Sequence, residues 1–221
     1  MTHKVKIVHK QWLTHDVMQL KMERPEGFSF KAGQAIEASL EQPKFENVWS
    51  PFTITSLSNE EFLEFTIKTY PKHERLTLAL SKLNEGDSCL ITDPWDSFKN
   101  KGAGVFIAGG TGVTPFIALL RKMYSDGEIG KSSLFFANKT EKDIFHFDEF
   151  RKMLGDNFIN ILSREKKEPY LHGHIDKAFL KKHISNFNQP FYLCGPDGFA
   201  KDIQVYLKEL GAGDDMVNIS L

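Results

Sequence analysis

The sequence contains few cysteines, no long apolar run and almost no excess of either charge. Its two cysteines, Cys89 and Cys194, are too few for a disulfide framework, an all-cysteine zinc site or a four-cysteine iron–sulfur cluster. No apolar stretch approaches the ~20 residues that span a bilayer, and the N-terminus lacks the apolar core of a signal peptide. These absences favour a cytoplasmic protein.

Charge balance and histidine spacing argue against two further kinds of partner. The chain has 28 basic and 29 acidic residues, and its net charge of −1 gives no sign of nucleic-acid or anionic-membrane binding. His172 and His174 alternate, but no third ligand follows at a recognisable spacing, so we expect no metal site.

The periodicity of hydrophobic residues along the chain changes near residue 100. With 221 residues, of which 41% are hydrophobic, it can form one large domain or two small ones. Residues 1–99 show short runs of alternating apolar residues and one helical stretch at 74–83, which predicts an antiparallel β-barrel. After the Gly/Lys-rich linker, residues 104–221 alternate short strands with amphipathic helices, which predicts a parallel sheet covered by helices on both faces.

The strongest local signal is the segment VFIAGGTGVTPFIALLR, which begins at Val105. A buried strand ends at Gly109-Gly110, and a short turn leads to Thr114, a favoured helix N-cap, with Pro115 at the first helical position. Glycines allow backbone N–H groups to approach an anion, and a helix N-terminus favours negative charge. The segment therefore indicates a diphosphate site, the alternative being a tight turn without a ligand.

Two other segments are ambiguous when taken alone. FYLCGPDGF places Cys194-Gly195-Pro196 at the end of another parallel strand, where α/β proteins bind ligands, although a lone cysteine is also typical of a buried core. WSPFTITS places Phe52 beside the hydroxyl of Thr53, a pattern that also suits a core strand.

In this order and at these separations, the three segments resemble those of the ferredoxin–NADP reductase family of flavoproteins. The resemblance covers nearly the whole chain, and the G-G-T-G-x-T-P and C-G-P elements match in full at 109–115 and 194–196. In that family an N-terminal flavin-binding barrel precedes a C-terminal nicotinamide-binding α/β domain. The resemblance therefore implies domains at 1–99 and 104–221.

The resemblance also implies roles for individual residues. In the flavin motif R-x-Y-[ST]-x-x-S, here 50–56, Phe52 matches the aromatic that stacks on the flavin and Thr53 the hydroxyl near flavin N5. A segment like D-G-x-T-x-x-L, here 74–80, contacts the flavin phosphates. Thr53 and Cys194 are the predicted catalytic residues. The predicted cofactor-binding residues are Phe52, Thr53, Ile67, Lys68, Arg75, Leu76, Thr77, Gly110, Thr111, Gly112, Thr114, Ser163, Arg164, Cys194, Gly195 and Pro196.

Two departures from the family pattern concern the flavin diphosphate. The family arginine that neutralises it is replaced by Ser50, and the family glycine of the phosphate segment is replaced by Arg75. Because a guanidinium group suits phosphate geometry, we expect Arg75 to take over this charge.

A further segment bears on the choice of nicotinamide cofactor. Ser163-Arg164 resembles the pair that holds the 2′-phosphate of NADP in the family, and Lys166 and Lys167 add positive charge beside it. A solvated loop is the alternative interpretation. The resemblance thus implies NADPH or NADH as one cofactor, with NADPH favoured weakly, and FAD, or FMN, as the other.

The implied function is that of a flavin-dependent NAD(P)H oxidoreductase. Hydride would pass from nicotinamide C4 to flavin N5 in a cleft between the domains, and electrons would leave one at a time. The length and the cysteine count lead us to expect a separate acceptor, by family default a ferredoxin or a flavodoxin. The alternatives are a reductase subunit of a larger oxygenase complex and a non-catalytic flavin-binding protein, which the loss of arginine at Ser50 would suit.

Overall fold

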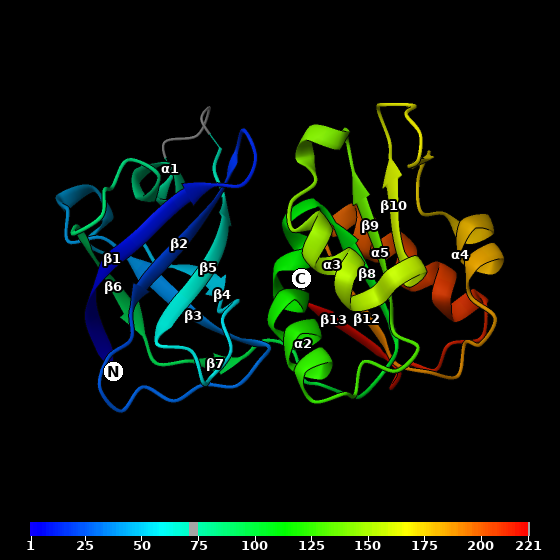
Figure 1. Cartoon of the computed structure of the whole chain (residues 1–221), viewed down its shortest axis with the longest axis horizontal. Helices are drawn as coiled ribbons and strands as arrows, with labels where there is room; N and C mark the ends of the chain where they lie inside the picture. The colour runs from blue at the N-terminus through cyan, green and yellow to red at the C-terminus, as the bar shows by residue number, and fades with distance from the viewer. Residues whose placement is uncertain (71–74, 221) are drawn as a thin grey trace. The chain divides into compact units, whose positions relative to one another are not determined.

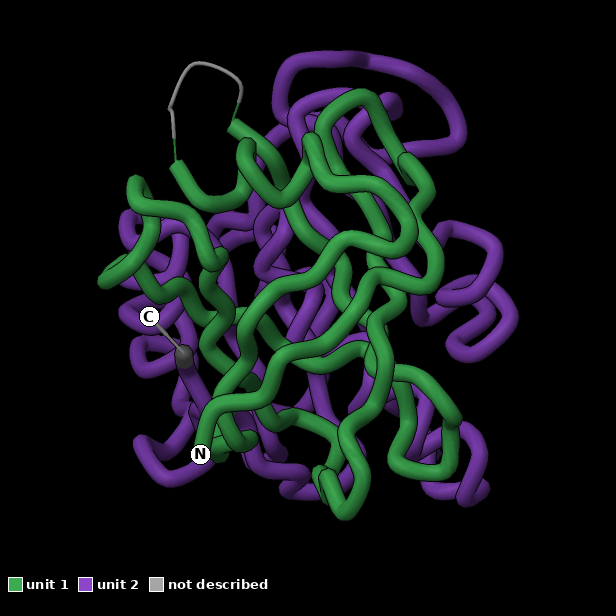
Figure 2. Tube along the Cα trace, turned by 90° about the vertical axis from the view of Figure 1, so that its left-hand side faces the viewer, with its two compact units in different colours: residues 1–97 green, residues 98–221 purple. Residues whose placement is uncertain are grey.

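A computed structural model describes residues 1–70 and 75–220, and it divides the chain into two compact units, Met1–Ser97 and Phe98–Leu221 (Figures 1 and 2). The first unit ends two residues before the barrel boundary expected at residue 99. Within the described residues, no helix is both long and apolar enough to cross a membrane.

The first unit is an antiparallel, nearly closed β-barrel, as predicted. Its strands follow the sheet order β4-β3-β6-β1-β2-β5, with β7 paired to β3. Thr55, just after β4, donates its backbone N–H to the Glu64 carbonyl of β5 at 2.7 Å and so links the two ends of this order. The strands are β1 (Thr2–Trp12), β2 (Val17–Glu23), β3 (Gln34–Ser39), β4 (Ser50–Thr53), β5 (Phe62–Lys68), β6 (Ser88–Thr92) and β7 (Trp95–Asp96).

Alternating apolar side chains fill the barrel, because successive residues of a strand point to opposite faces of the sheet. Cys89 belongs to this core, where its sulfur lies 3.5 Å from that of Met22, and burial raises the pKa of its thiol to about 12. The helix expected at 74–83 is shorter: α1 spans Leu76–Leu80, between strands β5 and β6. Glu74 lies outside the described residues.

The second unit is a parallel six-stranded sheet with helices on both faces, as predicted (Figure 1). Phe116 of α2 and Phe150 of α3 pack against Phe106 and Phe136 of the sheet, whereas α4 and α5 bury the face that carries Ile107. The elements are β8 (Val105–Gly109), η2 (Gly110–Val113), α2 (Thr114–Ser125), β9 (Ser133–Asn138), η3 (Glu141–Asp143), α3 (Phe147–Leu154), η4 (Gly155–Asn157), β10 (Phe158–Leu162), β11 (Leu171–His172), α4 (Lys177–His183), β12 (Phe191–Cys194), α5 (Asp197–Glu209) and β13 (Val217–Ser220).

The segment that precedes β8 is fastened to the second unit by one buried side chain. The Tyr192 ring stacks on Phe106 with centroids 4.1 Å apart. Its hydroxyl accepts from the Lys101 backbone N–H at 2.7 Å and donates to the Gly102 carbonyl at 2.8 Å. The residues expected to form a linker are therefore held against the α/β sheet at these two positions.

Candidate functional site

The glycine-rich turn lies where the strand order of the parallel sheet reverses. The order is β11-β10-β9-β8-β12-β13, so the chain proceeds from β8 outward through β9 and β10 and then returns to β12 on the other side of β8. Ala108 of β8 is in register with Cys194 of β12, and both strands end at the same edge. Open α/β sheets bind ligands at the carboxyl ends of strands at such a reversal.

Two glycines of this turn are required for different physical reasons. A Cβ atom at Gly112 would lie 2.3 Å from the Cys194 carbonyl oxygen and 2.6 Å from the Gly195 nitrogen, so the turn can approach β12 only without a side chain. Gly110 has a φ of +55°, which L side chains rarely adopt, and the space beyond its Cα is open. The turn therefore packs against β12 at Gly112, where no side chain intervenes, and the space beside Gly110 is open.

The expected N-cap at Thr114 is wrong. Thr114 is the first residue of α2, after Val113, and Pro115 is the second. The Thr114 hydroxyl donates to the Thr111 carbonyl at 2.9 Å, because the turn winds into a 3₁₀-helix that brings this carbonyl within reach. No side chain caps the start of α2, but the Thr114 N–H already donates to the Thr111 carbonyl and Pro115 has no N–H, so a diphosphate would be met by the backbone of the glycine turn itself.

Cys194 and its two neighbours form the other wall of this edge. Cys194 is half-buried, and burial raises the pKa of its thiol to about 11 despite a hydrogen bond from the Gly195 backbone that lowers it. The sulfur is therefore an uncharged thiol at neutral pH, suited to packing rather than nucleophilic attack. Position 195 can hold only glycine without a shift of its neighbour, because a Cβ there would lie 2.6 Å from the Phe199 ring. Pro196 is exposed just before α5.

In the barrel, β4 carries the expected flavin residues. Phe52 and Thr53 are both half-buried, and Phe52 packs partly against the barrel core. The motif continues into buried residues that close the barrel: the Thr55 hydroxyl donates to Glu64 Oε1 at 2.9 Å, and the Glu64 N–H donates to Ser56 Oγ at 3.0 Å. Ser56, the final serine of the motif, thus accepts a hydrogen bond from β5. No sequence pattern indicated Glu64 as its partner.

The residues expected at the flavin phosphates differ in what they can offer. Thr77 Oγ1 is buried and, among the described residues, has no hydrogen-bond partner. Arg75 is exposed at the start of α1, and no side-chain partner for it occurs within residues 1–70 and 75–220. A buried hydroxyl and an exposed guanidinium group two residues apart in the chain fit an oxygen-rich anion.

The remaining three residues offer less. Leu76 and Ile67 are buried in the core, so only their main chains could contact a cofactor. Lys68 is ion-paired, with its Nζ 2.6 Å from Asp16 Oδ2, because β2 and β5 are neighbours. Its charge is therefore already balanced within the barrel.

The segment after β10 leaves fewer free cations than expected. Ser163 and Arg164 donate their backbone N–H groups to Asn138 and Lys139 at 2.9 Å, which sets the segment beside the end of β9. Arg164 and Lys166 are exposed, but Lys167 is ion-paired to Glu141. Of the three cations expected beside a 2′-phosphate, Lys167 is therefore partly neutralised, because Glu141 follows the neighbouring strand.

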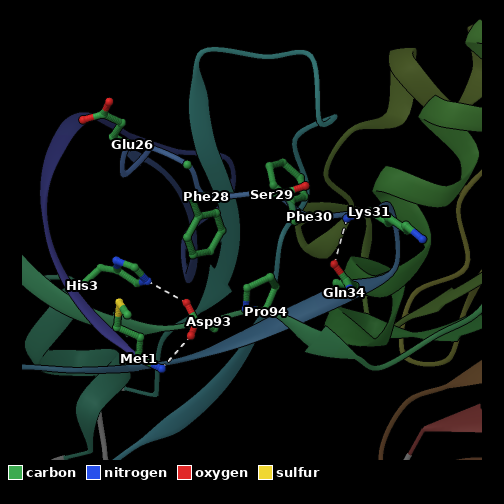
Figure 3. A pocket seen from close by; sticks show the side chains of 11 residues that line it. Met1, His3, Glu26, Phe28, Ser29, Phe30, Lys31, Gln34, Asp93 and Pro94 are labelled. Carbon is green, nitrogen blue, oxygen red and sulfur yellow. Dashed lines mark hydrogen bonds and ion pairs between the residues drawn. The ribbon is translucent and has the colours of Figure 1, made fainter.

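A pocket of about 540 Å³ opens in the barrel unit, and its lining residue Gln34 accepts a hydrogen bond from the Ile54 N–H of the 50–56 motif at 3.0 Å (Figure 3). His3 Nε2 lies 2.8 Å from Asp93 Oδ1 on one side of it, and the ring of Phe28 meets His3 edge-on. None of its lining residues belongs to the predicted flavin segments. It contributes nothing to the assignment of the site.

Known families match both units. A family described as an FAD-binding domain matches residues 2–109, and one described as an oxidoreductase NAD-binding domain matches residues 106–205. The fold and the two matches define a flavoprotein reductase architecture with FAD- and NAD-binding domains. The chain thus carries an FAD-binding domain and an oxidoreductase NAD-binding domain, and its fold is that of ferredoxin–NADP reductase-like FAD/NAD-binding oxidoreductases.

Curated relatives are longer than this chain. The reductase component of propane 2-monooxygenase from Rhodococcus jostii (strain RHA1) is 27% identical, over 93% of this chain and 59% of its own length. NADH-cytochrome b5 reductase 2 from Mycosarcoma maydis is 29% identical, over 82% of this chain and 58% of its own length. The chain thus spans a little under three fifths of these relatives.

Solved structures share the fold. The flavohem-like FAD/NAD-binding domain of nitric oxide dioxygenase from Vibrio cholerae O1 biovar El Tor has a TM-score of 0.86 and 19% identity, over 97% of this chain and 96% of that one. A ferredoxin NADP⁺ reductase from Neisseria gonorrhoeae, with bound FAD and NADP, has a TM-score of 0.82 and 19% identity, over 95% and 92%.

Proposed function

We propose that this chain is a flavin-dependent NAD(P)H oxidoreductase that passes electrons from a nicotinamide cofactor to a separate acceptor. The observation that carries the proposal is the open, uncapped glycine turn at the strand-order reversal, in a chain whose other unit matches an FAD-binding domain. A protein that only stored flavin would have no use for a second nucleotide site.

The chain's own residues have binding and orienting roles in this proposal. Gly110, Thr111 and Gly112 receive the nicotinamide cofactor's diphosphate, and Thr114 holds the turn through its bond to the Thr111 carbonyl. Cys194 packs as a neutral thiol beside the nicotinamide, with Gly195 and Pro196 shaping the wall.

In the barrel, Phe52 stacks on the flavin ring and Thr53 orients near its reactive nitrogen. Thr77 and Arg75 hold the flavin phosphates, with main-chain contacts from Ile67, Lys68 and Leu76. Bound FAD supplies the conversion between two-electron and one-electron transfer. No side chain has to act as general acid or base, so the residues contribute chiefly through positioning.

We assign the cofactor preference to Ser163 and Arg164, and favour NADPH. Arg164 and Lys166 are exposed cations in a segment held beside the end of β9, where a 2′-phosphate would find charge-assisted hydrogen bonds. The bound anion would be exposed to solvent, so its affinity should decline with added salt.

For the acceptor we propose a redox protein, either a ferredoxin or flavodoxin or the partner component of an oxygenase. The names of two relatives support the second choice: the propane 2-monooxygenase reductase component and the naphthalene 1,2-dioxygenase reductase component from Pseudomonas putida, the latter 22% identical over 92% of this chain.

The test is anaerobic reduction of the reconstituted protein. The chain is loaded with FAD, freed of excess and titrated with NADPH and separately with NADH while the visible flavin absorbance is followed. Stoichiometric bleaching by either donor supports the proposal. FAD that stays bound and oxidised with both donors would instead make the chain a non-catalytic flavin-binding protein.

A further inference from the structure

The segment 163–170 is fixed by the connection that follows the neighbouring strand β9. Two backbone bonds join it to the end of β9, from Ser163 to Asn138 and from Arg164 to Lys139. Three further contacts reach Glu141, at the start of η3, while the Tyr170 ring also meets the Phe147 ring edge-on and His172 Nδ1 lies 2.9 Å from the Glu165 carbonyl oxygen.

Glu141 makes three contacts with this segment. Its carboxylate accepts from Lys167 Nζ and, at 3.2 Å, from the Tyr170 hydroxyl. Its backbone N–H donates to Glu165 Oε2 at 2.8 Å. The Lys167 ammonium group lowers the pKa of the Glu141 carboxyl, so the carboxylate stays charged at neutral pH.

Glu141 is itself held in place. Thr140 and Asp143 form a reciprocal capping box around η3, with the Thr140 backbone N–H 2.8 Å and its hydroxyl 2.7 Å from Asp143 Oδ2. A capping box satisfies two backbone donors and fixes the entry to a helical turn. The carboxylate that anchors the segment is therefore presented from a rigid turn.

These contacts divide the charges of the segment into two groups. Glu165 accepts a hydrogen bond from the Glu141 N–H, and Lys167 is ion-paired with the Glu141 carboxylate. Arg164 and Lys166 are exposed and have no ion-pair partner in the described part of the chain. We propose that Glu141 is a positioning residue that holds Arg164 and Lys166 ready for the 2′-phosphate of an adenine dinucleotide. This inference rests on the proposed assignment of that phosphate to Arg164.

The sign of the effect separates positioning from simple electrostatics. A carboxylate near an anion site repels the anion, so its removal should strengthen binding if charge alone mattered. If Glu141 positions the segment, its removal should weaken binding instead. Exposed ion pairs stabilise a fold by only about 0–1 kcal/mol, so the fold itself should be barely affected.

The experiment uses the FAD-loaded chain and two probes that need no electron transfer. Binding of adenosine 2′,5′-bisphosphate and of adenosine 5′-monophosphate is measured by calorimetry at physiological salt, which screens distant charges. The variants are Glu141→Gln and Tyr170→Phe, which deletes one bond to Glu141 without changing charge. Glu168→Gln is the matched control, because Glu168 is exposed on the same segment and loses the same charge.

We expect both test variants to bind the bisphosphate about two- to fivefold more weakly, with unchanged monophosphate binding and melting temperature. Glu168→Gln should bind it as tightly as wild type or more tightly. Tighter or unchanged bisphosphate binding by Glu141→Gln overturns the inference alone. Equal loss of both probes makes the contacts merely structural and overturns it too. A wild type that does not distinguish the probes overturns the phosphate assignment and the role of Glu141 with it.

Discussion

Substitution of Gly112 by alanine is the sharpest test of the nucleotide site. The added Cβ would lie 2.3 Å from the Cys194 oxygen and 2.5 Å from its carbonyl carbon. Both are main-chain atoms at the end of a central strand, so no side-chain rotation can relieve the contact. The turn must move away from β12, and with it the N–H groups that would face a diphosphate.

The size of the effect follows from overpacking. Forcing one extra carbon into a filled space costs typically ~1–3 kcal/mol, and 1 kcal/mol shifts the melting temperature of a chain of this size by about 2–4 °C. We therefore expect Gly112→Ala to melt up to about 12 °C lower than wild type and to bind NAD(P)H much more weakly. FAD retention should not change, because the predicted flavin residues all lie in the other unit.

Two alanine variants serve as matched controls. Gly198→Ala adds a Cβ on α5 with nothing within 4 Å and should leave stability unchanged or slightly raised. Gly110→Ala also meets open space but requires a positive φ, which costs about 1–2 kcal/mol. Thermal melts and NAD(P)H titrations of all three variants separate the clash from backbone strain. A Gly112→Ala protein with wild-type stability and wild-type coenzyme affinity would refute the reasoning.

Three further predictions concern the other sites. Phe52→Ala should weaken FAD retention by at least about 0.5–1.5 kcal/mol, because a stacked ring is lost, and unchanged affinity in a flavin titration would contradict the β4 assignment. Arg164→Ala should raise KM for NADPH by one to two orders of magnitude, since a charge-assisted bond contributes about 1.5–3 kcal/mol, and leave NADH kinetics nearly unchanged; equal loss with both donors would make the arginine structural. Burial opposes ionisation of Glu149, but hydrogen bonds from His146 and Arg121 lower its pKa to about 2, so its stabilising effect is present above about pH 4.5 and is lost as pH falls toward 2. Denaturation of Glu149→Gln should therefore show a smaller loss of stability across that acid range than wild type, and identical slopes would exclude this carboxylate as a source.

The two units were predictable because each has its own periodicity. Apolar residues alternate along the short strands of residues 1–99, and strands alternate with amphipathic helices beyond residue 104. Each pattern indicates which faces are buried. The glycine turn was equally readable, since Gly110 and Gly112 stand directly after a buried strand. The likeness to a family added the predicted roles of Phe52 and Thr77, which local patterns alone could not supply.

What the sequence could not supply are contacts between residues far apart in the chain. Gly112 is glycine because of the Cys194 main chain, and no local pattern shows that β8 and β12 are neighbours. The ion pair of Lys167 could not be foreseen because its partner Glu141 belongs to a different strand connection. Thr114 was assigned as an N-cap by residue type, whereas the 3₁₀ winding before it decided its hydrogen bond.

The raised thiol pKa values have a practical consequence for labelling. With pKa values of about 11 and 12, the thiols of Cys194 and Cys89 stay almost entirely protonated at neutral pH. Maleimides and iodoacetamides react with the thiolate, so the two native cysteines of the wild-type chain should react only slowly with these reagents. A single cysteine introduced on an exposed strand or helix of either unit could then carry a fluorophore or spin label selectively, without removal of either native cysteine.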